Sequence, residues 1–233
     1  MLELDGLTGG YGRAQVLFDV SLRVGEGELV CLMGRNGMGK TTTVKTLMGL
    51  LPAWGGAVRV DGTVVTGAGA ARIARMGLGL VPEGRQVFPN LTVTENLVAT
   101  AANRRAAEGP WTLDRVYALF PALRDRRASF GNLLSGGEQQ MLAIGRALMT
   151  NPRLLILDEA TEGLAPVVRD QIWACLERLR ALGQAVLIID KHVKRLMPLT
   201  TRFYVIERGR IVWSGRPDDL DAEQSQLTRY LAV

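Results

Sequence analysis

The chain contains little cysteine and histidine, with two cysteines and one histidine in 233 residues. Cys31 lies in a predicted strand and Cys175 in a predicted helix, and neither belongs to a CxxC pair or to a spacing typical of metal ligands. A disulfide framework and a cysteine-based metal site are therefore not expected. Both thiols are predicted to be reduced core residues, as in proteins of the cytosol.

Long hydrophobic runs are also missing. No stretch approaches the roughly 18 apolar residues that a membrane-spanning helix requires. Glu3 and Asp5 stand near the N-terminus with no long apolar segment beside them, which differs from the pattern of a secretory signal peptide. The sequence therefore predicts neither a membrane span nor an export signal.

A strongly basic segment is absent too. The formal net charge is +5, and the densest basic run, residues 124–127, is interrupted by Asp125. Because nucleic-acid binding usually depends on a basic stripe, we expect no nucleic-acid partner. We interpret the run as a solvent-exposed face, with a protein-docking surface as the alternative.

What is present predicts an α/β protein. The composition, 47% hydrophobic and 22% charged, is that of a globular domain, and the length accommodates one large domain with a small insertion. Alternation, buried apolar runs and helical periodicity locate the elements. Strands are expected within 2–24, at 29–33, in a hairpin at 58–65, and at 78–81, 154–157, 185–189, 203–206 and 211–213, and helices at 41–50, within 92–150 and at 166–182. Pro52 and the pair Gly55-Gly56 are expected to end the first helix.

A glycine-rich segment lies between the strand 29–33 and the helix that follows. It fits the pattern G-x-x-x-x-G-K-[ST], whose glycines let backbone N–H groups approach a polyphosphate. Lys40 would bring a positive charge to the β/γ oxygens, the Thr41 hydroxyl would ligate Mg²⁺, and the helix N-terminus favours the same anion. The predicted nucleotide-binding residues are Gly34, Arg35, Asn36, Gly37, Met38, Gly39, Lys40, Thr41 and Thr42.

Two later motifs narrow the chemistry. The strand 154–157 ends in Asp158-Glu159, an acidic pair placed where a metal-binding carboxylate and a water-activating one would sit. About a hundred residues after the glycine-rich segment, Leu134 is followed by a serine, two glycines and an acid. The serine is a good N-cap for the helix that follows, and a helix N-terminus is also an anion site, so both interpretations hold together. The residues are Ser135, Gly136, Gly137 and Glu138.

In this order the three motifs resemble those of the ATP-binding-cassette (ABC) ATPase family. The resemblance implies a P-loop α/β core with an N-terminal antiparallel β portion and an inserted helical subdomain at 90–150, within one domain spanning 1–233. It implies ATP and Mg²⁺ as cofactors. Asp158 would hold Mg²⁺ through water, and Glu159 would polarise the attacking water.

The same resemblance implies roles for two further segments. Tyr11 matches an aromatic residue that stacks on the adenine, with Val16 as a weaker packing partner. The alternative for Tyr11 is a turn aromatic that covers the core. The loop Ser135–Glu138 would bind the γ-phosphate of the ATP held by a second ATPase subunit, so a monomer should bind ATP but hydrolyse it poorly.

Three positions depart from the family pattern. Glu83 stands where most members carry a glutamine that touches Mg²⁺ and senses the transmembrane partner. Leu164 stands where an aspartate helps signal between the two sites. Lys191 aligns with the histidine that contacts the γ-phosphate, while the only histidine is His192. We favour Lys191 as the phosphate contact and interpret His192 as a surface residue at a helix start.

Within the family, residues 81–85, 87–93, 135–146 and 163–166 are similar to ATPase subunits of branched-chain amino acid importers, the LivF-type group. This resemblance implies a peripheral protein on the cytoplasmic face of the inner membrane. Its partners would be ABC permease subunits, a second ATPase subunit that is identical or not, and, indirectly, a periplasmic binding protein. The groove around residues 83–88 and the helical insertion would face the permeases.

Other functions stay open at this stage. Closely similar ATPases serve urea and short-amide importers. A soluble ABC ATPase acting on DNA or ribosomes would be expected to carry a coiled-coil insertion or a second cassette, which this sequence lacks. A regulatory module that binds nucleotide without turnover is a further alternative, and Glu159 argues against it.

Overall fold

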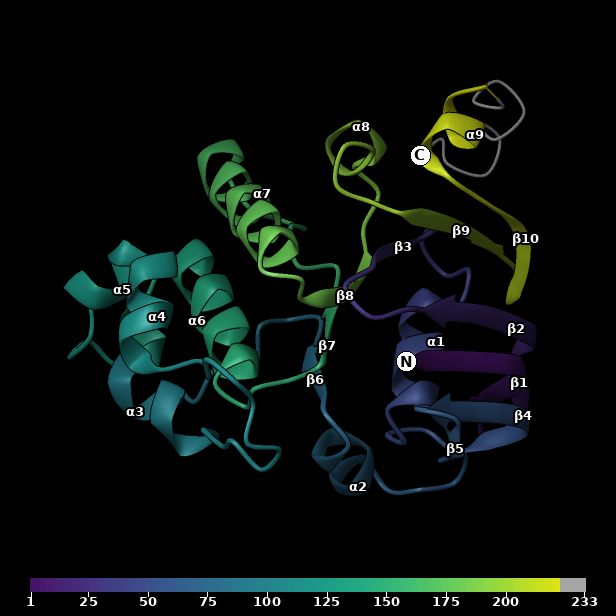
Figure 1. Cartoon of the computed structure of the whole chain (residues 1–233), viewed down its shortest axis with the longest axis horizontal. Helices are drawn as coiled ribbons and strands as arrows, with labels where there is room; N and C mark the ends of the chain where they lie inside the picture. Colours follow the sequence, from purple (N-terminus) through teal and green to yellow (C-terminus); the bar gives the residue numbers. More distant parts are fainter. Residues whose placement is uncertain (223–233) are drawn as a thin grey trace.

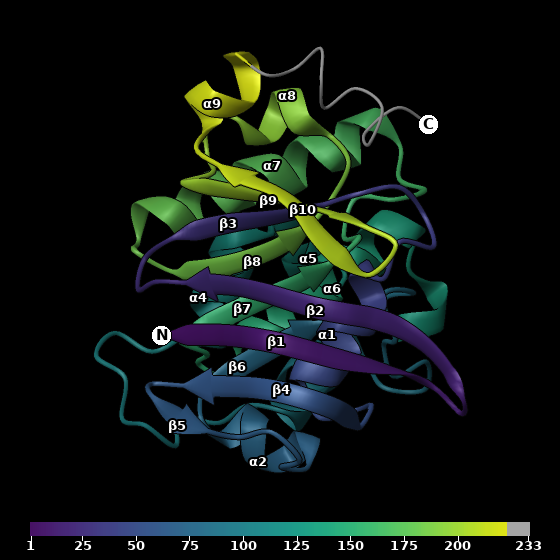
Figure 2. The same cartoon turned by 90° about the vertical axis from the view of Figure 1, so that its right-hand side faces the viewer.

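The computed structural model describes residues 1–222 and contains two β-sheets on either side of one helix (Figure 1). The smaller sheet is antiparallel, with the order β2-β1-β4-β5. Its strands are β1 (Leu2–Tyr11), β2 (Ala14–Val24), β4 (Ala53–Val60) and β5 (Thr63–Val64). Apolar residues alternate along β1 and β2 and turn one face of the sheet toward the core. In Figure 2, β2, β1 and β4 run side by side across the front of the molecule.

The larger sheet has the order β10-β9-β3-β8-β7-β6. Its strands are parallel except for β10, which pairs antiparallel with β9 at one edge. They are β3 (Leu29–Met33), β6 (Leu78–Val81), β7 (Leu154–Asp158), β8 (Ala185–Ile189), β9 (Arg202–Glu207) and β10 (Arg210–Gly215). Every residue of β3, β7 and β8 is buried. Continuous apolar strands of this kind are expected where both faces of a parallel sheet are covered.

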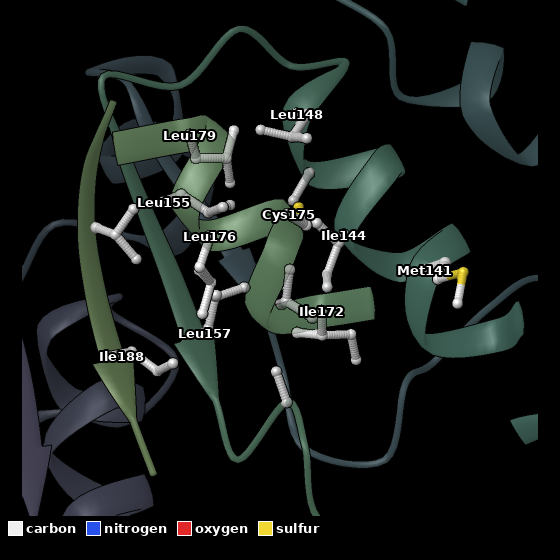
Figure 3. Close-up of a cluster of buried hydrophobic side chains, with 14 of the residues drawn as sticks. Met141, Ile144, Leu148, Leu155, Leu157, Ile172, Cys175, Leu176, Leu179 and Ile188 are labelled. Carbon is white, nitrogen blue, oxygen red and sulfur yellow. The ribbon is translucent and has the colours of Figure 1, made fainter. Parts of the chain in front are cut away.

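Two hydrophobic clusters cover the two faces of the larger sheet. On one face, Val30 and Leu32 of β3 join Val44 and Leu47 of α1 (Lys40–Leu47) and the apolar face of the smaller sheet. On the other face, α6 (Gly136–Leu148) and α7 (Pro166–Ala181) pack against β7 and β8. Figure 3 shows side chains of these four elements interleaved. The helix α1 is therefore enclosed between the sheets, and its first turn meets the end of β3.

Four α-helices lie between β6 and β7 in the sequence and gather on one side of the molecule (Figure 1). They are α3 (Val93–Ala99), α4 (Leu113–Leu119), α5 (Pro121–Asp125) and α6, with a short 3-10 helix at Gly131–Leu133. The helix α3 starts with a capping box formed by Thr92 and Glu95, as the sequence predicted. That residues 90–150 form a subdomain stays a proposal.

The remaining helices are short. They are α2 (Ala70–Arg75), α8 (Val193–Leu196) and α9 (Pro217–Ala222). The single domain predicted over 1–233 includes residues 223–233, which lie outside the described part. Among residues 1–222, no helix combines the length and the apolar character needed to cross a bilayer.

Two predicted boundaries were wrong. The helix expected at 41–50 ends at Leu47, and Gly55-Gly56 lie inside β4 rather than in a turn. Gly56 has φ 79°, and a Cβ there would lie 2.3 Å from the carbonyl oxygen of Gly6. The two strands approach this closely where the register of β1 and β4 shifts. Glycine therefore permits a β-bulge here, which a sequence pattern does not distinguish from a turn.

Candidate functional site

The glycine-rich segment forms the connection between β3 and α1, as predicted. Gly34 has φ 153°, and a Cβ there would lie 2.4 Å from the carbonyl oxygen of Ile206 in β9. Only glycine lets the loop leave β3 along this path. Gly37 and Gly39 also have positive φ, and Gly39 is the N-cap of α1. The backbone thus turns around the N-terminus of α1, where anions bind favourably.

Lys40 is buried at the centre of this turn. Its side chain is only 7% exposed. The ammonium donates to the carbonyl oxygens of Gly34 at 3.0 Å and Arg35 at 3.1 Å, and it lies 3.3 Å from the Glu159 carboxylate. These contacts hold one positive charge inside the loop and join the first predicted motif to the acidic pair.

Asp158 ends β7 with its carboxylate facing the start of α1. The Thr41 hydroxyl donates to Asp158 Oδ1 at 3.4 Å. Burial raises the pKa of Asp158 to about 6, the Thr41 hydrogen bond opposes this, and the negative charge of the exposed Glu83 adds to it. Hydroxyl and carboxylate oxygens are the ligands that Mg²⁺ prefers. Thr41 and Asp158 therefore fit a magnesium ion, with Glu83 close enough to contribute charge.

Glu159 follows in a backbone conformation with φ 54°, which is uncommon for a residue with a side chain. Its N–H donates to the carbonyl oxygen of Ile189, at the end of β8. Burial raises the pKa of Glu159 to about 7, a hydrogen bond to Glu162 adds to this rise, and Lys40 opposes it. The side chain is 15% exposed and can exchange a proton near neutral pH.

Tyr11 ends β1, and Val16 lies in β2. The Tyr11 hydroxyl is 3.5 Å from Thr42 Oγ1, and the side chain is 46% exposed. The ring therefore stands beside the first turn of α1 and is nearly half exposed, instead of covering the core. Val16 is partly buried and packs against the hydrophobic cluster that contains α1 and the apolar face of the smaller sheet. The structure brings Tyr11 to the P-loop and gives Val16 a packing contact.

The Ser135 loop opens α6 with a capping box. Ser135 Oγ accepts from Glu138 N at 3.3 Å, and Glu138 Oε2 accepts from Ser135 N at 2.8 Å. Figure 1 shows α6 and α1 on opposite sides of β6 and β7. Within the described residues, no hydrogen bond or ion pair joins this loop to the P-loop. One chain thus presents two separate halves of the predicted site.

The turn after β8 carries the alternatives Lys191 and His192. Lys191 Nζ lies 3.2 Å from Glu162 Oε1, and both side chains are about half exposed. His192 is the N-cap of α8, as expected of a helix start, but its side chain is only 28% exposed. Its Nδ1 is 2.6 Å from Asp190 Oδ1, and its Nε2 is 3.1 Å from Arg169 Nη1. The prediction of a surface histidine was therefore inaccurate, because the ring is held inward.

Two residues of this region were missed from the sequence. Glu162 contacts Lys191 and Glu159, and the buried Asp190 accepts hydrogen bonds from Thr161 and His192. A small cavity brings these loops together with the P-loop, and it is lined by Asn36, Lys40, Glu159, Thr161, Glu162, Asp190, Lys191 and His192. The sequence signal that could have identified them is the presence of acidic residues after β7 and β8, which are adjacent parallel strands. Leu164 does not line this cavity and packs against the hydrophobic cluster that contains α6 and α7.

The fold and this arrangement define a P-loop ATPase with the ATP-binding-cassette architecture. Residues 17–162 match the family described as ABC transporter. The chain is 43% identical over 212 residues to the high-affinity branched-chain amino acid transport ATP-binding protein BraG of Pseudomonas aeruginosa, with 91% of each chain covered. It is 33% identical to the lipopolysaccharide export system ATP-binding protein LptB of Escherichia coli (strain K12), with 99% of this chain and 96% of that protein covered.

Solved structures agree. The structure of an ATP binding subunit of an ABC transporter matches with a TM-score of 0.84 at 29% identity, covering 97% of this chain and 93% of that one. The chain belongs to the ABC transporter family. It is an ATP-binding subunit, and its ATP hydrolysis is coupled to transport. The resemblance predicted from the motifs and the predicted fold are confirmed.

Proposed function

We propose that this protein lies at the cytoplasmic face of the inner membrane and energises the import of branched-chain amino acids. The observation that carries the cargo is the 43% identity to a branched-chain amino acid transport ATP-binding protein over 91% of both chains. The identity to a lipopolysaccharide export protein is lower, at 33%. Cargo is selected by other subunits, so the assignment rests on this likeness and on the partners that the chain binds.

The site supports a division of roles among its residues. Lys40 would neutralise the β/γ-phosphate oxygens, while Tyr11 would stack on the adenine. Thr41 and Asp158 would hold Mg²⁺, with Glu83 as a further oxygen ligand, and when bound this ion neutralises phosphate charge. Glu159 would orient and polarise the attacking water. The proposal is supported by the 3.4 Å and 3.3 Å contacts that join Thr41 to Asp158 and Lys40 to Glu159.

A second ATPase subunit would complete each site. The loop Ser135–Glu138 lies away from the P-loop of its own chain, and Ser135 is exposed. The N-terminus of α6, which Ser135 caps, would there meet the γ-phosphate of the ATP bound by a partner. Two chains, identical or not, would therefore enclose two ATP molecules. Closure on ATP would move the permeases, and hydrolysis would reset them.

Glu159→Gln tests the hydrolytic role. The substitution keeps the shape of the side chain but removes the base, so ATP should still bind while phosphate release falls at least about 100-fold. Phosphate release and gel filtration with Mg-ATP would measure turnover and dimer formation, and the variant should accumulate as an ATP-bound dimer. Glu177→Gln, which changes an exposed carboxylate of α7, is the matched control. Wild-type turnover in Glu159→Gln would remove Glu159 from this role.

A basic groove offers the surface for the permeases. It has a volume of about 510 Å³ and lies between α2, β6, the segment 82–86 and α6. Among the described residues, no aspartate or glutamate lines the groove. Five arginines line it: Arg75, Arg85, Arg104, Arg105 and Arg146. Buried Arg146 Nε has no hydrogen-bond partner. Such a groove would suit an acidic cytoplasmic segment of a permease.

Co-purification from native membranes tests both the surface and the cargo. The wild-type chain should bring down two permeases and an ATPase partner, and vesicles containing them should take up branched-chain amino acids rather than urea. Arg104→Glu with Arg105→Glu should lose the permeases. Arg178→Glu with Arg180→Glu, an exposed pair in α7 outside the helical insertion, should retain them. Recovery of the chain with ribosomes or DNA, or urea uptake by the vesicles, would contradict the proposal.

A further inference from the structure

The turns after β7 and β8 are linked twice, beside the small cavity that these turns line together with the P-loop. The inner link is buried: the Thr161 hydroxyl donates to Asp190 Oδ2. The outer link is the ion pair between Lys191 Nζ and Glu162 Oε1, at 3.2 Å. Both links join the loop that carries Glu159 to the turn that carries Lys191. The two turns are therefore held together at the cavity that also contains Lys40.

Asp190 and His192 are engaged by other protein groups, so Lys191 is the residue of this turn that is available to a ligand. Asp190 accepts from both the backbone N–H and the ring of His192, at 2.8 and 2.6 Å. The other ring nitrogen lies 3.1 Å from Arg169 Nη1, and the ring makes an edge contact with Trp173, with centroids 6.0 Å apart. His192 is thus committed on both sides of its ring. Lys191 is held, in contrast, by a carboxylate at the rim of the cavity.

Glu162 has the contacts of a residue that positions others. Its carboxylate contacts Lys191 on one side and Glu159 on the other. Its hydrogen bonds to Glu159 and to Lys191 lower the pKa of Glu162, which keeps it negatively charged beside the ammonium. A lysine side chain has four rotatable bonds, and without a partner it would spread over many rotamers. The pair restricts the ammonium to the cavity rim.

We propose that Glu162 is a positioning residue for ATP hydrolysis, whose carboxylate holds the Lys191 ammonium where it meets the terminal phosphate. The inference rests on the proposed function, with Lys191 as the contact to the γ-phosphate that the family resemblance implies. Because the pair is half exposed, it shifts the population of the productive lysine rotamer by about twofold to fivefold and no more. Glu162 therefore tunes the rate of hydrolysis and is not required for nucleotide binding.

A double-mutant cycle on steady-state ATP hydrolysis by the full chain tests this inference. Glu162→Gln should lower kcat about twofold to fivefold with KM for ATP unchanged. In a Lys191→Met background the same change should have no further effect, because Glu162 acts through Lys191. Glu162→Asp should recover part of the loss. Asp170→Asn is the control. It breaks the exposed ion pair between Asp170 of α7 and Arg195 of α8, which are 3.0 Å apart, and should leave kcat unchanged.

Two outcomes would overturn the inference in different ways. If Lys191→Met lowers kcat but Glu162→Gln costs the same factor with and without Lys191, Glu162 does not act through the lysine, and the role of Lys191 stands alone. If Lys191→Met hydrolyses ATP like the wild type, while His192→Ala is slow, the proposed role of Lys191 fails together with the inference. Thermal melts of each variant separate these results from a loss of folding.

Discussion

At the scale of single residues, the site depends on neighbouring side chains placed in different surroundings. Asp158 is buried at the end of a strand beside a hydroxyl, whereas Glu159 adopts a positive φ and reaches Lys40. One backbone step therefore sends two carboxylates to different partners. The positive φ of Glu159 turns the chain so that its side chain meets the P-loop lysine, which explains how adjacent acids can take the separate roles proposed for them.

The burial of Asp158 predicts a pH-dependent stability. Its folded pKa of about 6 exceeds the ordinary value of 3.8, so the associated stability is complete below pH 4 and is lost as the pH rises through 6. The difference corresponds to at most about 3 kcal/mol. Asp158→Asn cannot titrate, so its free energy of unfolding should rise relative to that of the wild type by about 1.4 kcal/mol between pH 5 and pH 8, because roughly half of the difference is already lost at pH 5.

Urea denaturation of both proteins at the two pH values, without nucleotide and with a chelator present, would measure this gain. The chelator matters because a bound cation would stabilise the carboxylate form of Asp158. Parallel behaviour of the two proteins at pH 5 and pH 8 would show that burial does not raise the pKa of Asp158.

At the scale of elements, the start of α6 serves packing as well as the proposed phosphate contact. Gly137 is buried against Val168 of α7, and a Cβ there would lie 2.6 Å and 2.8 Å from the two methyl carbons of that valine. The two helices can approach this closely only because position 137 has no side chain. Both helices also cover β7, so their packing sets where the Ser135 loop lies relative to the large sheet.

Gly137→Ala should therefore destabilise the protein by about 1–3 kcal/mol, the range for overpacked sites. Adding Val168→Ala should recover part of the loss, because the two methyl groups in the way are removed. Gly136→Ala is the matched control: its Cβ would meet the end of the flexible Arg85 side chain, which can move aside. Thermal or urea unfolding measures all four proteins. Equal losses at both glycines, without recovery by Val168→Ala, would contradict the packing argument.

At the scale of the whole molecule, the larger sheet is enclosed on both faces and the ligand-facing loops all leave one end of its strands. The P-loop follows β3, the acidic pair ends β7, and Lys191 follows β8. These three strands are adjacent and parallel. Parallel neighbours bring the loops at their carboxyl ends together, which is why residues more than a hundred positions apart share one cavity.

The enclosed core predicts that both thiols are protected. Cys31 in β3 and Cys175 in α7 are buried. Burial raises the pKa of Cys31 well above its ordinary value and that of Cys175 to about 12, with Arg178 opposing the shift at Cys175. Because the thiolate is the reactive form, a thiol reagent should label neither cysteine in the native protein and both in denaturant. A Cys175→Ser variant would assign the signals, and one fast-reacting thiol in native protein would contradict this.

Much of the fold could be predicted because its signals are local. Apolar runs identified the buried strands, and capping residues identified the starts of α3 and α6. The boundary error at Gly55-Gly56 arose where backbone geometry depends on another strand, whereas α1 ends at Leu47 shortly before Gly49, which has φ 66°. In the candidate site, the glycine-rich segment and the acidic pair stand at the ends of the strands predicted for them. Glu162 and Asp190 were missed because each makes its contacts with residues about 30 positions away along the sequence.

The sequence by itself determined the order of motifs, the strand that precedes each of them and the family, since these follow from residue types at short spacing. Only the tertiary structure decided that Tyr11 stands beside Thr42, that His192 turns inward to Asp190 and that Lys191 meets Glu162. The physical reason is that side-chain partners across a sheet depend on strand order and register. Those are properties of the packed molecule, and no local pattern of residues specifies them.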